Sequence, residues 1–439
     1  MAVAAARAAR TLSSEFAPTG LQFASTTLPF ADRQNASIIA DALSLPESLS
    51  TTDVTGSLRC ATTALITSLN SADDRLIVAA DKRKTRPASS LEMTIGDAAA
   101  AIETGSNELL AVFLASHSLS IDLTDHYREA HSEFDYQLED RWVRDEGHLK
   151  IIPRAINHLL QELSFDASEI NHFIVAGPDH KTATLIADRC GIPADAVSNN
   201  LALECGHTGC PHPFLMLIHA LESAQAGEKL LVIGFGQGCD ALLFEATELV
   251  DRLHATKPVQ TLLDGGVVDS NYQRYLSFNH LVELDWGMRA ERDNRTAQSA
   301  FFRHRKAMTG FIGGRCEFCG TAQFPSSSIC VNPDCRRPGL QADEPFSDKQ
   351  ATVKSYTEDW LAHSYNPPFK YGNVRFEGGG VVMMEFADFS AEELVVGAPV
   401  SMQFRIKDED SRRGFKRYFW KAAPIAGLHN TIGGSPKNG

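Results

Sequence analysis

The sequence has 439 residues, enough for two or three domains with a sizeable core. Its 41 Lys and Arg against 55 Asp and Glu give a formal charge of −14, which offers a nucleic acid or an anionic membrane no general attraction. No apolar run is long enough to span a bilayer, the start MAVAAARAARTL lacks the pattern of a signal peptide, and the cysteines are typical of a reducing compartment. We therefore expect a cytoplasmic protein that binds neither nucleic acid nor membrane.

Apolar strands and helices alternate along the first half of the chain. Strands are predicted at 21–27, 75–80, 172–176 and 229–234, and helices at 60–69, 151–163, 180–190 and 213–224. Residues 55–81 and 206–235 share one order, which is a Gly-bearing turn, a buried helix, a short linker and an apolar strand. This repeat predicts a duplicated α/β half-domain with mostly parallel, buried sheets.

The segment 120–150 is charged and aromatic and has no clean apolar period. We expect it to pass over a site or to form a dimer contact. Tyr127, Tyr136 and Trp142 in this segment are expected to pack, although a phenol there could protonate an enolate.

Four cysteines lie in two closely spaced pairs, Cys316 with Cys319 and Cys330 with Cys335. Four thiolates on two tight turns can form a closed tetrahedral site, which is the structural kind of zinc site. Unrelated or disulfide-bonded cysteines are the alternative, and a reducing compartment disfavours it. The pattern therefore predicts one structural Zn²⁺.

The chain beyond these cysteines changes character. Short strands separated by turns are expected at 351–357, 380–386, 399–405 and 416–421. Their number and length are typical of a small closed barrel of OB type.

Two family resemblances cover nearly the whole chain. Residues 1–285 resemble the thiolase superfamily, in particular its hydroxymethylglutaryl-CoA synthase-like branch, in DVTGSLRCATTAL, IGDAAAAIETG, GHTGCPHPF and GFGQGCDALLF. Residues 300–423 resemble the zinc-ribbon and OB-fold family that accompanies thiolase-like acyltransferases and aldolases, in GRCEFCGTAQFP, YNPPFKYGNVRFEGGG and YFWKAAP. The resemblance implies an acyl-CoA thioester as substrate and a homodimer.

The resemblance also implies the fold class and the domain order. The class is α/β, with a thiolase-like duplicated domain followed by a zinc ribbon and an OB-type β-barrel. The expected parts are a thiolase-like domain at 1–285, a helical connector at 286–312, the ribbon at 313–340, the OB-fold domain at 341–425 and a flexible tail at 426–439. The strand and helix that usually open the thiolase fold, roughly 45–60 residues, are expected to be missing ahead of Met1.

The residues of a condensing enzyme are not where the family keeps them. Matching the motifs puts Leu58 at the nucleophilic Cys, Ala176 at the general-base His and His207 at the Asn of the second turn, while the synthase Glu falls near Thr26. A Claisen condensation needs an acylatable thiolate and a base, and this alignment supplies neither. Cys60 lies two residues after Leu58, about 200° round the helix, so we expect it in the core, with a nucleophilic role as the alternative.

Other polar groups remain for chemistry. His207 is the leading acid–base candidate, with helix capping or core hydrogen bonding as the alternative, and Asp179 and His180 are secondary candidates beside Ala176. A second metal site built from Cys205, Cys210, His207 and His212 does not match usual ligand spacing. Backbone contacts to the substrate are expected at Ser57, Gly206, Gly236 and Gly238.

The leading hypothesis is an acyl-CoA lyase that cleaves a β-hydroxyacyl-CoA by retro-aldol chemistry, without an acyl-cysteine intermediate. The alternative is a hydroxymethylglutaryl-CoA synthase-like condensing enzyme or acyltransferase that uses Cys60 or another thiol. An alternative of another class is a catalytically silent subunit that binds acyl-CoA or acts as a scaffold.

Overall fold

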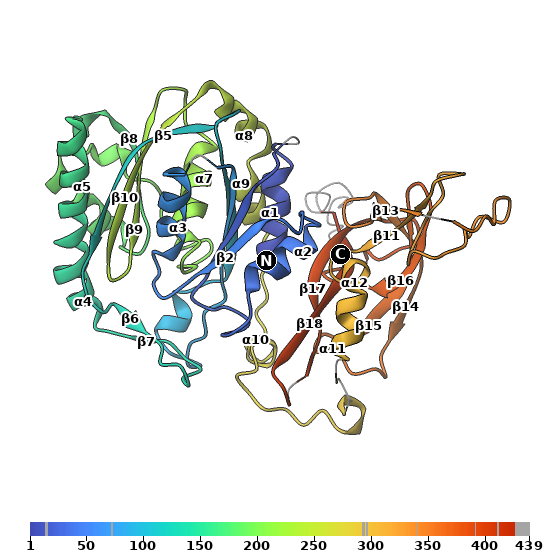
Figure 1. Ribbon diagram of the computed structural model, residues 1–439. Helices are drawn as coiled ribbons and strands as arrows, with labels where there is room; N and C mark the ends of the chain where they lie inside the picture. Colours follow the sequence, from blue (N-terminus) through green and yellow to red (C-terminus); the bar gives the residue numbers. More distant parts are fainter. Residues whose placement is uncertain are drawn as a thin grey trace, which may run out of the picture. The chain divides into compact units, whose positions relative to one another are not determined.

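The computed structural model describes residues 1–425 apart from 14, 15, 72, 292–294, 296, 340, 391 and 411. The tail predicted at 426–439 lies outside the described residues. The chain divides into a first unit, Met1–Ser37 with Glu47–Gly266, and a second unit, Ile38–Pro46 with Val267–Gly439 (Figure 1). Among the described residues, none of the helices combines the length and apolar character needed to cross a membrane.

The first unit contains a four-stranded sheet in the order β2-β1-β3-β4. β1 (Gly20–Ala24) is parallel to β2 (Ser50–Val54) and to β3 (Arg75–Asp81), and β4 (Ala98–Thr104) is antiparallel to β3. All of β3 beyond its first residue is buried, as expected for an apolar strand covered on both faces.

A second four-stranded sheet has the order β5-β10-β9-β8. β8 (Ile170–Val175) is parallel to β9 (Lys229–Phe235), and β10 (Gly238–Ala246) is antiparallel both to β9 and to β5 (Ala111–Ser120). The trio β8-β9-β10 thus repeats the trio β1-β3-β4, which confirms the predicted duplication. β5 has no counterpart beside β4 in the part of the chain that the structure describes.

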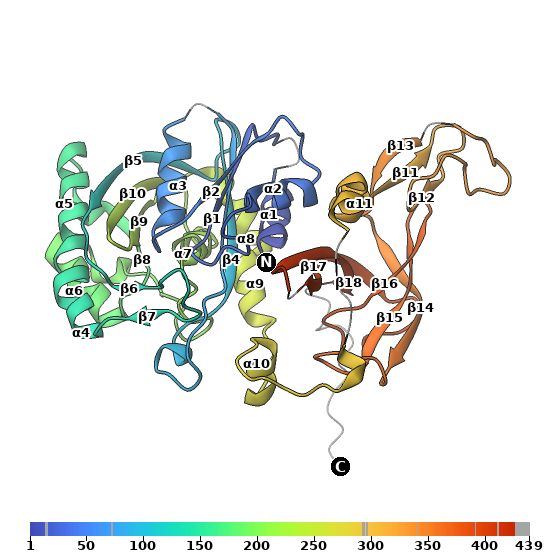
Figure 2. The same ribbon diagram turned by 60° about the horizontal axis from the view of Figure 1, so that its bottom comes forward.

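Helices cover both sheets and fill the space between them (Figures 1 and 2). α3 (Cys60–Leu69) and α7 (His212–Leu221) contact each other and strands of both sheets. Their sequences, CATTALITSL and HPFLMLIHAL, are apolar on nearly every face, as expected for helices enclosed by two sheets. α1 (Ala2–Arg10) packs on β3 and β4, and α5 (Ile151–Leu163) packs on β5 and β10.

The excursion between the two halves is a short hairpin followed by a turn of helix. β6 (His126–Tyr127) pairs with β7 (Tyr136–Gln137), and α4 (Asp140–Trp142) and η2 (Val143–His148) lead into α5. The remaining elements up to residue 266 are α2 (Asn35–Ala42), η1 (Leu91–Met93), η3 (Ala167–Glu169), α6 (His180–Cys190), η4 (Ala194–Ala196), η5 (Glu248–Val250), α8 (Asp251–Thr256) and α9 (Pro258–Asp264).

The second unit is rich in strands. It contains a three-stranded sheet in the order β12-β11-β13 and a five-stranded sheet in the order β16-β15-β14-β17-β18. A bridge from Phe386, beyond β16, to Ala422 in β18 brings the ends of the larger sheet together, which is compatible with the predicted OB-type barrel. The elements are α10 (Tyr272–Phe278), η6 (Met288–Ala290), α11 (Gln298–Arg303), α12 (Arg305–Met308), β11 (Ile312–Cys316), β12 (Ala322–Gln323), β13 (Gln341–Pro345), β14 (Ala351–Asp359), β15 (Phe369–Phe376), β16 (Val381–Glu385), β17 (Pro399–Asp410) and β18 (Phe415–Pro424).

An aromatic cluster joins the two sheets of the second unit. Phe311, Phe346 and Trp420 are fully buried. The ring of Phe311 lies 5.7 Å from that of Phe346 and 6.3 Å from that of Trp420, and the Trp420 Nε1–H donates to the carbonyl of Thr309 at 2.7 Å. The smaller sheet therefore shares its core with the larger one.

Candidate functional site

The turn that enters α3 lies against the loop between β9 and β10. The Ser57 hydroxyl and the Arg59 Nε both donate to the carbonyl of Gly236, at 2.7 and 3.0 Å. Gly236 has φ +155, and a Cβ there would lie 2.7 Å from Ser57 Oγ, so only glycine allows this close approach. The predicted contact residues Ser57 and Gly236 are thus brought together, beside the half-buried Leu58.

Cys60, the first residue of α3, lies in the core and not at this turn. It is 3% exposed and belongs to the same apolar cluster as Cys210 and Phe214. This placement agrees with the packing role expected from its rotation away from Leu58.

The turn that precedes α7 holds His207. Its backbone N–H donates to the carbonyl of Thr94 at 2.8 Å, and its Nδ1 accepts from the N–H of Gly209 at 3.3 Å. Because Nδ1 accepts, the neutral ring carries its proton on Nε2. That Nε2 lies 3.9 Å from the position that a Cβ on Gly177 would occupy.

A second histidine, His148 at the end of η2, faces the same point. Its Nε2 also lies 3.9 Å from the Cβ position of Gly177, and its ring packs edge-on against Phe235 at 4.8 Å. Gly177 has φ +105 and is exposed, so the space in front of both rings is open and free of a side chain. Gly177 directly follows Ala176, where the resemblance places the family's base. The histidine next to the position of the family's base is therefore His148, which comes from η2 and not from the segment that holds Ala176.

Both imidazoles are neutral at pH 7. Burial lowers the pKa of His148 to about 4, although Asp125 and Asp179 act in the opposite direction. Burial is the main cause that holds the pKa of His207 well below 6.5, and the cationic Arg83 acts in the same direction. A neutral imidazole presents one donor and one acceptor, so the pair can take a proton at one atom and give one at another.

His212 has a structural role behind His207. It is 1% exposed, and its ring stacks on that of His207 at 4.9 Å. Its Nδ1 accepts from the N–H of Thr208 at 3.2 Å, and its Nε2 lies 2.8 Å from the carbonyl oxygen of Asn200, to which it donates. In the described chain, His207, His212, Cys205 and Cys210 do not form a group with ligand atoms close enough for a metal ion.

Asp81, at the end of β3, holds several turns of the site together. Its carboxylate accepts from the Ser25 hydroxyl at 3.0 Å and from the N–H groups of Thr26, Thr27 and Cys210 at 2.7, 3.1 and 2.8 Å. The Thr26 hydroxyl, at the place of the synthase Glu, also donates to Asp81, at 3.0 Å. Asp81 is 1% exposed, so these bonds are shielded from water.

The excursion adds charged groups to the same region. Asp135 pairs with Arg83 Nε at 2.7 Å and with Arg128 Nη1 at 2.9 Å. Asp125 lies 3.2 Å from the His126 ring. Burial alone would raise the pKa of Asp125, but the neighbouring His126 outweighs burial, and the pKa is lowered.

The other predicted site residues lie at the edge of this region or outside it. Asp179 caps α6, where it accepts from the Thr182 N–H at 2.7 Å, and this bond lowers its pKa. His180, the next residue, is exposed. Tyr127 and Tyr136 pack on each other at 5.3 Å, and Trp142 is 49% exposed.

The remaining two predicted glycines, Gly206 and Gly238, allow close approaches between backbone segments. A Cβ on Gly206 would lie within 3 Å of the Ile95 backbone, and a Cβ on Gly238 would lie 2.0 Å from the Leu119 carbonyl oxygen in β5. Sequence reasoning did not single out His148 and Arg83, which the structure adds to the site.

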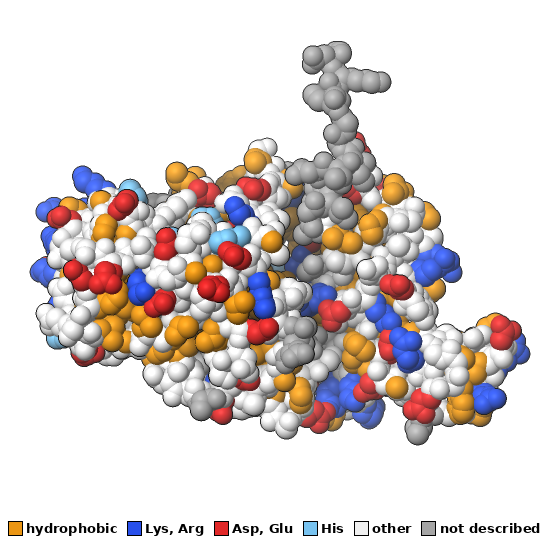
Figure 3. All heavy atoms as spheres, turned by 90° about the horizontal axis from the view of Figure 1, so that it is seen from above, with side chains coloured by type: hydrophobic (Ala, Val, Ile, Leu, Met, Phe, Trp, Pro, Cys, Tyr) orange, Lys and Arg blue, Asp and Glu red, His pale blue; other side chains and the backbone are white. Residues whose placement is uncertain are grey.

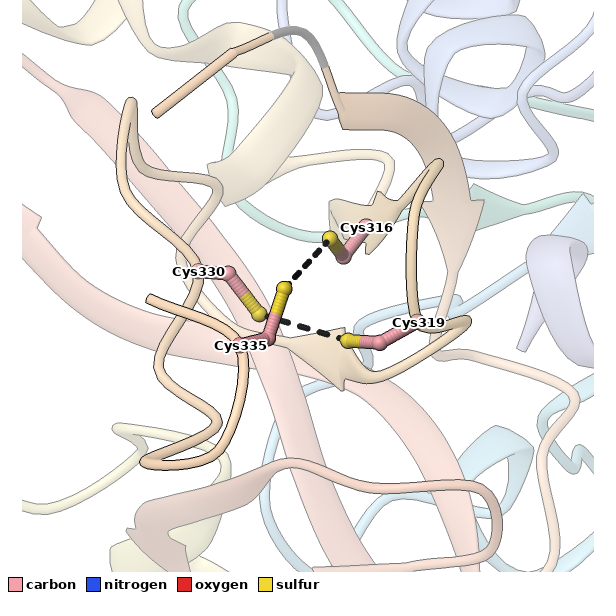
Figure 4. A group of neighbouring side chains, drawn as sticks. All are labelled: Cys316, Cys319, Cys330 and Cys335. Atoms are coloured by element: carbon pink, nitrogen blue, oxygen red, sulfur yellow. Dashed lines mark hydrogen bonds between the residues drawn. The ribbon is translucent and has the colours of Figure 1, made fainter. Parts of the chain in front are cut away.

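The four predicted zinc ligands converge in the second unit (Figure 4). All four Sγ atoms of Cys316, Cys319, Cys330 and Cys335 lie within 4.8 Å of one another, with 4.0 Å between Cys316 and Cys335 and 3.6 Å between Cys319 and Cys330. A tetrahedral site with Zn–S bonds of about 2.3 Å has S···S edges of about 3.8 Å, so the cluster fits zinc. Hydrogen bonding to Thr321 lowers the pKa of Cys319 to about 6, which favours its thiolate, whereas the pKa values of Cys330 and Cys335 are raised when no metal is bound.

Charged side chains are spread over the surface. On the face drawn in Figure 3, cationic and anionic groups are intermingled on both units. The surplus of acidic residues is thus not gathered in one region of that face.

Comparisons with known proteins agree with the duplicated fold. Residues 160–244 match the family 3-oxoacyl-[acyl-carrier-protein (ACP)] synthase III C terminal. The chain is 25% identical over 278 residues to hydroxymethylglutaryl-CoA synthase of Caldivirga maquilingensis, covering 61% of this chain and 79% of that protein. It is 26% identical over 230 residues to hydroxymethylglutaryl-CoA synthase of Thermococcus onnurineus, covering 51% and 65%.

Solved structures give the same fold. The structure of 3-oxoacyl-(acyl carrier protein) synthase III from Pseudomonas aeruginosa PAO1 aligns with a TM-score of 0.50 at 21% identity, over 56% of this chain and 82% of that one. A structure of HMG-CoA synthase complexed with CoA aligns with a TM-score of 0.51 at 15% identity, over 59% and 73%.

The first unit is therefore a duplicated α/β domain with the thiolase-like fold. More particularly, its fold is the one seen in the solved structures of 3-oxoacyl-(acyl carrier protein) synthase III and of HMG-CoA synthase. The prediction of this fold from the sequence is confirmed.

Proposed function

We propose that this protein forms or cleaves a carbon–carbon bond next to the thioester of an acyl-CoA, by enolate chemistry without an acyl-cysteine intermediate. The observation that carries the proposal is the convergence of two neutral histidines, His148 and His207, on the open space at Gly177. The thiolase-like domain supports an acyl-CoA as the substrate.

The position of the cysteines supports a route without a covalent intermediate. Leu58 stands where the resemblance places the nucleophile, and Cys60 is buried in the core. An acyl transfer to sulfur requires a thiolate that the thioester can reach. Cys60 does not meet that requirement.

The two histidines can supply the proton transfers of an aldol reaction. In the condensing direction, one imidazole removes the α-proton of the acyl-CoA, and the enolate carbon attacks the carbonyl of the second substrate. The other imidazole donates its proton to the oxygen of that carbonyl, which becomes the β-hydroxyl. The reverse steps cleave a β-hydroxyacyl-CoA.

The comparisons favour one direction. Both relatives described above are named hydroxymethylglutaryl-CoA synthase, which supports the alternative, a condensing enzyme that uses a thiol, better than the lyase. Because Cys60 is buried in the core, we take only the direction of the reaction from these relatives and not the thiol. We propose condensation as the working direction, with retro-aldol cleavage as its reverse.

α-Proton exchange in deuterium oxide tests the proposal directly, because it needs enolate formation and no second substrate. We expect the protein to deuterate the α-carbon of a member of a panel of acetyl-, propionyl-, butyryl- and glutaryl-CoA, detected by mass spectrometry. Cys60→Ala should keep most of this activity, and His207→Ala should lose about 10²-fold or more, the usual scale for an acid–base group. His158→Ala, which changes an exposed histidine on α5, is the matched control.

Two outcomes would overturn the proposal. Loss of exchange in Cys60→Ala, together with an acylated Cys60 found by mass spectrometry, would establish the thiol-dependent condensing enzyme. Binding of acyl-CoAs without exchange or turnover would establish the catalytically silent subunit.

We also propose a structural Zn²⁺ held by the four clustered cysteines, and a homodimer, as the resemblance implies. The zinc would supply folding energy to the second unit and no catalytic step, because four thiolates leave no open position for substrate.

A further inference from the structure

Arg83 is a buried cation whose hydrogen-bonding capacity is mostly unused. It follows β3 by two residues, and its side chain is only 5% exposed. Its Nε donates to Asp135 at 2.7 Å. Neither Nη atom has a hydrogen-bond partner within the described ranges of the chain.

The neighbours of Arg83 fix the position of its guanidinium group but do not fully neutralise its positive charge. Asp135 is 3% exposed and also binds Arg128 Nη1 at 2.9 Å, so two guanidinium groups share one carboxylate. Arg128 Nη2 donates to the carbonyl of Thr26. The carboxylate of Asp81, two residues before Arg83, is engaged by hydroxyl and N–H groups.

A guanidinium held in a nearly buried place, with Nη atoms that the protein leaves unpaired, can bind an anionic group of a ligand strongly. Arg83 also lies near the reacting end of the site, because Asp81, two residues before it, accepts from the N–H of Cys210 in the turn that holds His207. We therefore expect a ligand group that completes its pairing to belong to the acyl part of the substrate.

We propose that the two Nη atoms of Arg83, oriented by Asp135 and backed by Arg128, bind a carboxylate carried by the substrate. A guanidinium edge and a carboxylate match as a planar pair with two parallel hydrogen bonds. The substrate class is then an acyl-CoA that bears a second acid group. This inference rests on the proposed function. The ion pair with Arg83 would hold the acyl group of the substrate in place, which an acyl-cysteine bond would otherwise do.

The test compares two thioesters of equal chain length, glutaryl-CoA with a terminal carboxylate and pentanoyl-CoA with a methyl group. Isothermal titration measures binding to the full chain and does not depend on turnover. We expect the wild type to bind glutaryl-CoA at least about tenfold more tightly, as a paired, charge-assisted contact in a buried site would give. Arg83→Gln should remove the preference by weakening glutaryl-CoA alone, and Arg83→Lys should retain part of it.

Lys84→Gln is the matched control, because Lys84 is the next residue and a half-buried cation paired with Glu133. It should leave the preference unchanged. The comparison of the two thioesters on the wild type stands even if Arg83→Gln does not fold.

Each contrary result has a distinct meaning. Equal binding of the two thioesters by the wild type would overturn the carboxylate subsite and leave the proposed function in place. Equal weakening of both thioesters in Arg83→Gln would overturn it too, because the residue would then bind coenzyme A itself. Failure of the wild type to bind either thioester would overturn the proposed function and the subsite with it.

Discussion

Burial makes His148 a sensor of pH for the stability of the first unit. Its pKa is about 4 in the folded protein against an ordinary 6.5, so between these values the unfolded chain binds more protons. Stability is therefore fully present above pH 6.5 and is lost as the pH falls toward 4.

We expect His148 alone to remove about 2 kcal/mol of unfolding free energy between pH 7.5 and pH 5. Urea unfolding at the two pH values measures the loss. His148→Gln should reduce the difference by that amount, whereas the exposed control His158→Gln should not change it. An unchanged pH dependence in His148→Gln would show that the imidazole is not desolvated.

The candidate site was predictable where turn chemistry marked it. His207 follows a glycine before an apolar helix, and the family resemblance puts it at the place of the Asn in that turn. His148 lies in a segment without periodicity, and Arg83 lies in the charged run DKRKTR, which is typical of a solvated surface. Only the folding of residues 120–150 against the end of β3 encloses them, and no local pattern records that contact.

At the scale of elements, Asp81 connects the ends of β1 and β3 to the turn before α7. Asp81→Asn replaces one acceptor oxygen with a donor that faces other donors, so buried N–H and hydroxyl groups lose their partner. We expect a loss of about 2–4 kcal/mol in unfolding free energy, measured by urea denaturation.

Asp73→Asn provides the comparison, because Asp73 is 56% exposed and pairs with Arg75. It should change stability by less than about 0.5 kcal/mol. An Asp81→Asn protein as stable as Asp73→Asn would contradict the role given to Asp81.

Most elements of the first unit were predictable because burial on both sides makes them continuously apolar. Helix 151–163 has the predicted bounds, and the strand predicted at 229–234 is one residue longer. β5 and β15 were not predicted. β5 alternates between half-buried and exposed residues at the edge of its sheet, and β15 begins after two prolines that read as loop.

At the scale of the whole molecule, the zinc cluster should control the second unit without controlling the first. Phe311 and Phe346 link the smaller sheet to the larger one through a shared core. Structural zinc contributes on the order of 10 kcal/mol to folding, more than a small β domain can lose. Cys330→Ser should therefore release the metal and unfold the second unit.

Elemental analysis and calorimetry measure the two effects. We expect about one zinc per wild-type chain, and loss of one of two thermal transitions in Cys330→Ser. Cys190→Ser changes a buried cysteine of the first unit and should keep the metal. Folded wild-type protein without zinc would contradict the assignment of the cluster.

The two sheets of the first unit share a trio of strands but carry the fourth strand at opposite edges, β2 beside β1 and β5 beside β10. β5 lies along the outer edge of β10, whereas no described strand lies along β4. In an antiparallel pair, alternate N–H groups point away from the neighbour. We expect the outward-pointing N–H groups of β4 to exchange with solvent deuterium in the native state, whereas those of β10 should exchange only after a local opening. The duplicated halves therefore share a topology but not a rate of amide exchange.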